Sequence, residues 1–142
     1  MAARENQREV PVIVLDEVSP LPKYQQIVEQ VKDHIAHGRL APGAPLPSVR
    51  QLAGDLGINV NTAIAAYRVL EAEQVIVLRR GARATVHPRL AAPAAPRADD
   101  IARVRADLER AHTAALLLGM DAPAVRALVD EVFGAETSGG AA

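Results

Sequence analysis

The sequence contains no cysteine and very few aromatic residues. Without cysteine the chain has no disulfide, no thiolate metal ligand and no cysteine nucleophile. With two Tyr, one Phe and no Trp, any core must be built mainly from Ala and aliphatic side chains. This composition favours helices that pack through small and aliphatic residues.

Long apolar segments are also missing. Neither a secretory h-region nor an apolar run of about 18 residues is present, so we expect a soluble cytoplasmic protein without a membrane partner. A length of 142 residues allows one domain or two small ones with a modest core.

The net charge of −1 hides an uneven distribution. Residues 1–19 carry a net charge of −2, residues 20–90 carry +4 and residues 91–142 carry −3. A basic middle between acidic ends fits a polyanion-binding module joined to a separate partner-binding part. Ordinary scatter of charged residues is the alternative explanation.

The stretch from residue 46 to residue 73 predicts two short helices joined by a turn. Ser48 marks the start of the first helix and forms a capping box with Gln51, and Gly57 marks the end of this helix. Its apolar positions, spaced for one helical face, are Val49, Leu52, Ala53 and Leu56. A second helix from about Asn61 has the inner positions Ala63, Ala66, Tyr67 and Leu70. This is a helix-turn-helix outline, which also occurs in proteins that do not bind DNA.

The flanking segments extend the outline to a winged helix-turn-helix. An amphipathic helix is predicted over residues 24–37, and the β-branched run 10–15 can add an edge strand. Residues 75–78 and 84–87 predict a β-hairpin with a basic tip at residues 79–83. A cationic hairpin beside a recognition helix suits backbone or minor-groove contact with DNA. Alternatively, its arginines merely solubilise an exposed turn.

The composition along the chain predicts five segments, and the last third differs from the winged domain. We expect a flexible tail at 1–9, the winged domain at 10–87, a Pro/Ala linker at 88–98, two helices within 99–134 and a disordered tail at 135–142. Gly119 ends the first of these helices, Asp121 caps the second with Pro123 in its first turn, and Gly134 ends it.

These two helices are too short to stand alone, because domains below about 40 residues seldom fold without further support. Their apolar faces must therefore meet either the winged domain or a second copy of the chain. The linker favours a second copy, which predicts a two-helix dimerisation unit. The predicted dimerisation residues are Ile101, Val104, Leu108, Ala111, Ala115, Leu118, Val125, Leu128, Val129 and Val132.

Several blocks resemble the N-terminal domain of GntR-type bacterial transcription regulators, over about residues 12–87. The blocks are Tyr24-Gln25-Gln26-Ile27, Gly38 with Pro42-Gly43, Leu46-Pro47-Ser48-Val49-Arg50-Gln51-Leu52-Ala53, Asn59-Val60-Asn61-Thr62, and Ala66-Tyr67 with Leu70-Glu71. The short tail with Leu118-Gly119-Met120 is similar to the YtrA subfamily, which has a two-helix dimerisation part. The resemblance implies a homodimeric regulator, usually a repressor, on a pseudo-palindromic operator.

The chain departs from the family pattern at two places. Gln74 stands where a Gly usually follows the recognition helix, and a left-handed residue is costlier there. Arg83, Ala84 and Thr85 replace the Gly, Thr and Phe of the usual wing. These changes bear on wing conformation and minor-groove contact rather than on the fold.

Base reading requires short polar side chains at the start of the recognition helix. Asn59, Asn61 and Thr62 occupy that place. The alternative is that Asn61 only caps the helix and Asn59 serves the turn. The remaining predicted DNA contacts are Arg50, at a position that contacts DNA in GntR relatives, Arg80, Gly81 and Arg83 in the wing, and the weaker candidates Arg68 and Lys23.

No arrangement of catalytic residues is apparent, so we expect no enzyme, no cofactor and no metal. His34 and His37 lie three residues apart near a helix end, where His is favourable for dipole reasons alone. The rival to DNA binding is a winged helix used only for protein contacts. A small-molecule effector would need the dimer interface or the interdomain groove, acting on the spacing of the winged domains through the linker.

Overall fold

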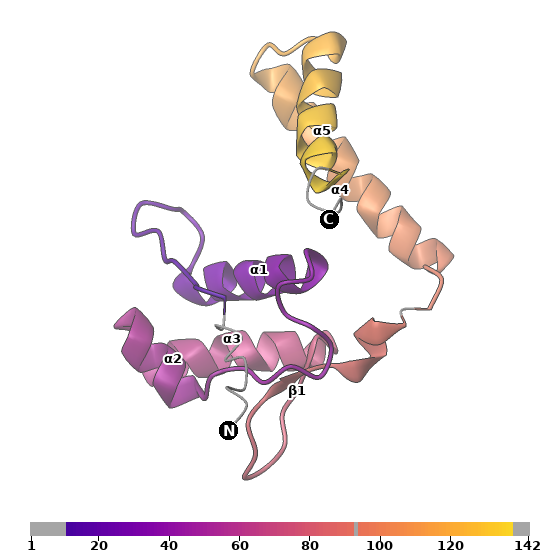
Figure 1. The fold of residues 1–142 in the computed structure, drawn as a ribbon. Coiled ribbons are helices and arrows are strands. Elements are labelled where there is room, and N and C mark those ends of the chain that lie inside the picture. Colours follow the sequence, from indigo (N-terminus) through magenta and orange to yellow (C-terminus); the bar gives the residue numbers. More distant parts are fainter. Residues whose placement is uncertain (1–10, 93, 138–142) are drawn as a thin grey trace, which may run out of the picture. The chain divides into compact units, whose positions relative to one another are not determined.

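The computed structural model describes residues 11–92 and 94–137, and the chain divides into two units, Met1–Pro93 and Ala94–Ala142 (Figure 1). We call them the N-terminal unit and the C-terminal unit. The prediction of a mainly helical chain with one small hairpin, built as a winged helix-turn-helix followed by two helices, is confirmed.

Three helices form the body of the N-terminal unit: α1 (Lys23–Ala36), α2 (Val49–Leu56) and α3 (Val60–Ala72). Both α1 and α2 pack against α3. The predicted inner face of the recognition helix is confirmed, because its four positions are all buried. The core consists of Ile27, Val28, Val31, Leu40, Leu46, Leu52, Ala53, Ala63, Ala66, Tyr67, Leu70, Ile76, Ala84 and Val86.

The wing is an antiparallel pair of short strands, β1 (Ile76–Val77) and β2 (Thr85–Val86). Ile76 pairs with Val86, and Val77 pairs with Thr85. The loop before α2 adds a third line of backbone hydrogen bonds. Its Gly43 N–H donates to the Val86 carbonyl at 2.8 Å, and its Leu46 N–H donates to the Ala84 carbonyl at 2.8 Å. The wing and the start of α2 are therefore joined through the backbone.

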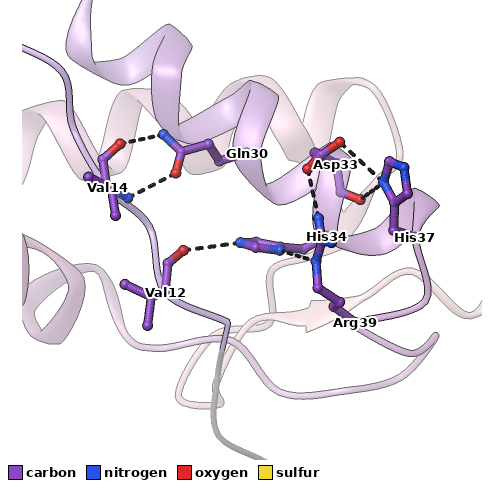
Figure 2. Close-up of polar contacts among 7 residues, drawn as sticks. All are labelled: Val12, Val14, Gln30, Asp33, His34, His37 and Arg39. Atoms are coloured by element: carbon purple, nitrogen blue, oxygen red, sulfur yellow. Dashed lines mark hydrogen bonds and ion pairs between the residues drawn. The ribbon is translucent and has the colours of Figure 1, made fainter. Parts of the chain in front are cut away.

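Residues 11–16 form no strand, so the predicted edge strand is wrong (Figure 2). The Gln30 side chain of α1 accepts from the Val14 N–H at 2.9 Å and donates to the Val14 carbonyl at 2.6 Å. The Gln26 amide likewise holds both the N–H and the carbonyl of Asp16. Side-chain amides thus take the hydrogen bonds that a neighbouring strand would supply.

The C-terminal turn of α1 carries a polar cluster that also holds this segment (Figure 2). Arg39 Nε donates to His34 Nδ1 at 2.8 Å, and its Nη2 donates to the Asp33 carboxylate at 2.7 Å. Because Nδ1 of His34 accepts, its Nε2 carries the proton and donates to the Val12 carbonyl at 3.2 Å. His37 Nδ1 lies 3.2 Å from the Asp33 carboxylate.

The predicted linker does not begin at residue 88. Pro88–Ala91 form a short 3-10 helix, η1, in which the Arg89 N–H donates to the His87 Nδ1 at 3.1 Å. Leu90 is half-buried and packs against the core of the N-terminal unit. The first four residues assigned to the linker therefore belong to the winged domain.

The C-terminal unit consists of α4 (Ala98–Leu117) and α5 (Ala122–Thr137). Gly119 adopts a left-handed φ of +77° after α4, and Asp121 Oδ1 accepts from the Ala124 N–H at 2.9 Å, as expected for the cap of α5. The predicted end at Gly134 is wrong. The helix runs through it to Thr137, since one helical Gly costs only about 1 kcal/mol.

The expected tail at residues 1–9 lies outside the described residues. The expected disordered tail at 135–142 is wrong at its start, because residues 135–137 belong to α5, and residues 138–142 lie outside the described residues. No described helix combines the length and the apolar character that a membrane crossing requires.

Side chains in the C-terminal unit remain accessible. None of those described between residues 94 and 134 is buried. Ile101 is 51% exposed and Leu108 is 53% exposed. Most apolar side chains of α4 and α5 are therefore left accessible in the single chain.

Candidate nucleic-acid interface

The recognition helix begins with Asn59 as its N-cap. The Asn59 Oδ1 accepts from the Asn61 N–H at 2.8 Å, and the Thr62 N–H donates to the Asn59 carbonyl at 3.0 Å. The alternative in which Asn61 caps the helix is therefore wrong. An N-cap side chain satisfies one of the four free N–H groups at the helix start.

This geometry gives the polar residues different capacities. The cap engages the Asn59 oxygen, so only its amide NH₂ remains to donate outward. Asn61 is exposed, and its side chain has no hydrogen-bond partner within the described chain. It alone keeps the oxygen and nitrogen that bidentate pairing with adenine requires. Thr62 is half-buried.

Exposed arginines also lie on both helices of the motif. Arg68 is exposed and lies seven residues after Asn61, which is two helical turns on the same side of α3. Arg50 is exposed in the first turn of α2. That turn starts at Ser48, whose Oγ accepts from the Gln51 N–H at 3.1 Å. This bond, from the Gln51 N–H to Ser48, is the half of the predicted capping box that the structure contains.

The charge distribution along α3 favours an anion at its start. The first turn contains no acidic residue, and the two acids near the helix end are Glu71 and Glu73. The helix dipole places its positive end at the N-terminus, where free N–H groups attract phosphate. Helix polarity and side-chain charge therefore act in the same direction.

The wing presents a basic turn. The Ala82 N–H donates to the Arg79 carbonyl at 3.2 Å, and Gly81 has a φ of +74°. Arg79 and Arg80 are exposed at this turn. Gly81 meets the backbone requirement of the turn without the strain that a side chain would introduce.

The unusual wing residues fit the fold. Arg83 Nε donates to the Leu46 carbonyl at 3.2 Å, so this side chain ties the wing to the loop before α2. Ala84 is buried, which suits a small side chain, and Thr85 pairs in the hairpin. Arg83, predicted as a DNA contact, thus has a structural partner that the sequence did not reveal.

Tyr67 provides a second tie to the same loop. This buried side chain of α3 donates its hydroxyl proton to the Pro47 carbonyl at 2.6 Å. Burial raises the pKa of Tyr67 to about 12, and the nearby charge of Arg83 opposes that rise. Since Pro47 precedes the cap of α2, the bond fixes the two helices of the motif to each other. The helical spacing had assigned Tyr67 only to the core.

The far end of α3 carries the predicted strain. Gln74 has a φ of +57°, in the left-handed region. The Gln74 N–H donates to the Glu71 carbonyl and the Val75 N–H to the Leu70 carbonyl, each at 2.9 Å. This is a Schellman motif with Gln in the position that Gly usually occupies.

A family model described as "Bacterial regulatory proteins, gntR family" matches residues 23–86. Among curated proteins, the HTH-type transcriptional repressor YtrA of Bacillus subtilis (strain 168) is 43% identical over 70 residues, which cover 49% of this chain and 54% of that protein. The chain spans about half the length of the curated relatives it matches.

Two solved structures are similar over more of the chain. YtrA from Sulfolobus acidocaldarius, a GntR-family transcription factor, is 35% identical with a TM-score of 0.56, covering 71% of this chain and 99% of that chain. A transcriptional antiterminator from Listeria monocytogenes EGD-e is 27% identical with a TM-score of 0.77, covering 87% of this chain and 90% of that chain. With its winged helix-turn-helix and these similarities, the chain belongs to the GntR family of bacterial regulatory proteins.

Proposed function

We propose that the chain is a sequence-specific DNA-binding transcription regulator that acts as a repressor. The observation that carries this proposal is the open start of α3, where the unpaired Asn61 amide stands on a helix N-terminus without acids. Exposed arginines on α2, α3 and the wing supply the phosphate contacts. The repressor named YtrA in Bacillus subtilis is a relative of this region.

In this proposal each side chain has a defined role. Asn61 reads a base, while Asn59 and Thr62 position the helix start or contact phosphate. Arg50, Arg68 and Arg80 bind the DNA backbone, and Gly81 lets the wing approach it closely. Arg83 reaches the DNA only with the terminal nitrogens that its bond to Leu46 leaves available.

The regulator binds its operator as a homodimer through the C-terminal unit. Apolar side chains of α4 and α5 that one chain leaves accessible would be covered by the same surface of a second copy. Ile101, Val104 and Leu108 line a hollow of about 400 Å³ that a partner side chain could fill. A two-fold dimer suits a pseudo-palindromic operator, because protein and DNA then share the same symmetry.

The same proposal assigns no enzymatic activity and places the protein in the cytoplasm on the nucleoid. Any effector would act through the dimer interface or through the spacing of the winged domains.

A titration of DNA at increasing salt tests the proposal. The full chain is titrated onto duplexes from its own promoter region and onto random duplexes, with Arg50→Ala and Asn61→Ala as variants. Arg50→Ala should weaken binding to both kinds of duplex. It should also reduce the salt slope, the slope of log affinity against log salt concentration, by about one, because one phosphate contact is lost. Asn61→Ala should reduce discrimination at one base pair per half-site by about 1–3 kcal/mol.

The outcomes separate the roles and the rival function. Equal loss on all sequences for Asn61→Ala would limit that residue to a phosphate contact. An unchanged slope with relaxed base preference would place Arg50 on a base edge. A chain that binds no duplex at low salt would instead be a winged helix used for protein contacts.

A further inference from the structure

The start of the interdomain connection is clamped to the end of the recognition helix. Arg89 of η1 donates from Nε to the Gln74 carbonyl at 2.9 Å and from Nη2 to the Glu73 carbonyl at 3.3 Å. These carbonyls lie at the C-terminal end of α3, the negative end of its dipole, where a guanidinium is favourable.

Neighbouring contacts hold both sides of this clamp. On the η1 side, His87 caps the helix and its N–H donates to the Val75 carbonyl at 2.9 Å, while Leu90 packs against the core. On the α3 side, the Glu73 carboxylate pairs with Lys32 of α1 at 2.5 Å. The segment Pro88–Ala91 is therefore part of the winged domain and cannot lengthen the connection while these contacts persist.

The clamp changes how far the connection can reach. Six residues, 92–97, separate η1 from α4. A chain spans at most about 3.3–3.6 Å per residue, so these six reach roughly 20–22 Å, whereas the ten residues 88–97 would reach roughly 33–36 Å if η1 were released. Half-sites one helical turn apart lie about 34–36 Å from centre to centre, so such a difference matters on that scale.

We propose that Arg89 is a positioning residue that determines which half-site spacings the dimer accepts. It does so by keeping four residues of each connection docked at the end of the recognition helix. With a short connection, the effective concentration of the second winged domain depends steeply on the separation of the two half-sites. A longer connection tolerates several half-site separations. This inference rests on the proposed binding of DNA by a homodimer.

A set of spaced duplexes tests the clamp. The half-site is recovered by selection in vitro from a randomised duplex library, and two copies are placed at separations that change by one base pair through one helical turn. The full-length wild-type chain is compared with Arg89→Ala, Arg89→Lys and Leu90→Ala. Affinity for each duplex and for a single half-site is measured, with the oligomeric mass checked for every variant.

The wild type should lose about tenfold in affinity when the preferred separation changes by two base pairs, while Arg89→Ala should vary less than about threefold across the set. Arg89→Lys should behave like Arg89→Ala, because an ammonium cannot span two carbonyls as a guanidinium does. Leu90→Ala, which leaves the charge unchanged, should also flatten the profile. Single half-site affinity and salt slope should stay at wild-type values.

Three results would overturn the proposal. Variant profiles parallel to the wild type would show that the clamp does not set spacing, and a flat wild-type profile would show that the connection does not limit it. Restoration by Arg89→Lys, with a salt slope lower by about one in Arg89→Ala, would make Arg89 a phosphate ligand. Failure of the wild type to bind even one half-site at low salt would instead overturn the proposed function.

Discussion

The two units of the chain bury their apolar side chains to very different degrees. In the N-terminal unit, Ile27, Val28 and Leu70 have no exposed surface, whereas in the C-terminal unit Leu108 remains 53% exposed. Both units are rich in Ala, Val and Leu, so composition does not explain the contrast. The N-terminal unit brings three helices, a hairpin and a loop around one core, while the other has only a helix pair.

This contrast separates two sources of stability. Apolar burial contributes roughly 25 cal/mol per Å² removed from water. A unit with its own core obtains this contribution within one chain, so its stability is independent of protein concentration. A unit with exposed apolar faces obtains it only when another surface covers them, and its stability then depends on concentration. Both tyrosines, Tyr24 and Tyr67, lie in the N-terminal unit, so tyrosine fluorescence reports on that unit alone.

The largest effect is expected from Leu70→Ala in the N-terminal core. Removing this fully buried side chain should reduce the free energy of unfolding by about 3–5 kcal/mol. Urea unfolding followed by tyrosine fluorescence measures it, and the loss should be the same at low and high protein concentration. A loss that changes with concentration would mean that the N-terminal unit also depends on a partner.

A charged side chain on the exposed apolar face of α4 should act on the C-terminal unit. Leu108→Asp places a carboxylate in the proposed interface and should weaken dimerisation by at least about a hundredfold, or roughly 3 kcal/mol. Sedimentation velocity over a concentration series measures the association, and tyrosine-detected unfolding should stay unchanged. Thr113→Asp, on the opposite side of α4, is the matched control. Dimers of unchanged affinity in Leu108→Asp would place the interface elsewhere.

Alkaline pH should destabilise only the N-terminal unit, through Tyr67. Its pKa is raised to about 12 in the folded chain, against about 10 in the unfolded chain. Between these values the unfolded chain has lost the proton that the folded chain retains. The free energy of unfolding should therefore fall as pH rises from 10 to 12, by about 2–3 kcal/mol from this residue.

Circular dichroism in urea at several pH values measures this loss. Tyr67→Phe should be less stable by about 1 kcal/mol at pH 7, because the Pro47 carbonyl loses its donor, and should show a smaller alkaline loss. Tyr24→Phe serves as the control, since Tyr24 is exposed. An identical alkaline loss in wild type and Tyr67→Phe would assign it to other groups.

The smallest expected effect is a gain from Gln74→Gly. A Gly at the left-handed position after α3 removes backbone strain, and the free energy of unfolding should rise by up to about 1 kcal/mol. The reciprocal control is Gly57→Ala, at a φ of +64° where an added Cβ meets nothing within 4 Å, which should cost about 1 kcal/mol. Unfolding by urea measures both, and a loss in Gln74→Gly would show that the Gln side chain stabilises the turn.

Local signals made much of the fold predictable. Ser48, Gly57 and Asp121 lie at helix ends where their own chemistry satisfies the backbone, and the inner face of α3 follows from helical spacing. The errors at the N-terminal edge strand and at the start of the linker arose where a distant side chain supplied a hydrogen bond to the backbone. Gln30 bonds to Val14, sixteen residues away, and Arg89 bonds to Gln74, fifteen residues away. Neither contact leaves a periodic pattern in the sequence.

The candidate site was predictable in place but not in detail. The spacing of Asn59, Asn61 and Thr62 located the start of the recognition helix. Two asparagines that can each cap a helix cannot be told apart by pattern, and only the geometry shows that Asn59 does so. The tie from Arg83 to Leu46 spans thirty-seven residues and depends on the closed hairpin. The assigned DNA contacts remain predictions.

The bond between Tyr67 and the Pro47 carbonyl has a consequence for how the proposed operator would be read. With the two helices of the motif joined through a buried hydroxyl, a tilt of one against the other would stretch this hydrogen bond, at a cost of about 1 kcal/mol if it breaks. Adjustment then falls to the duplex, whose bending cost varies with base sequence. Flexible pyrimidine–purine steps at positions that no side chain touches should therefore raise affinity. The rigidity of the protein would then make the flexibility of the DNA one of the features by which a binding site is recognised.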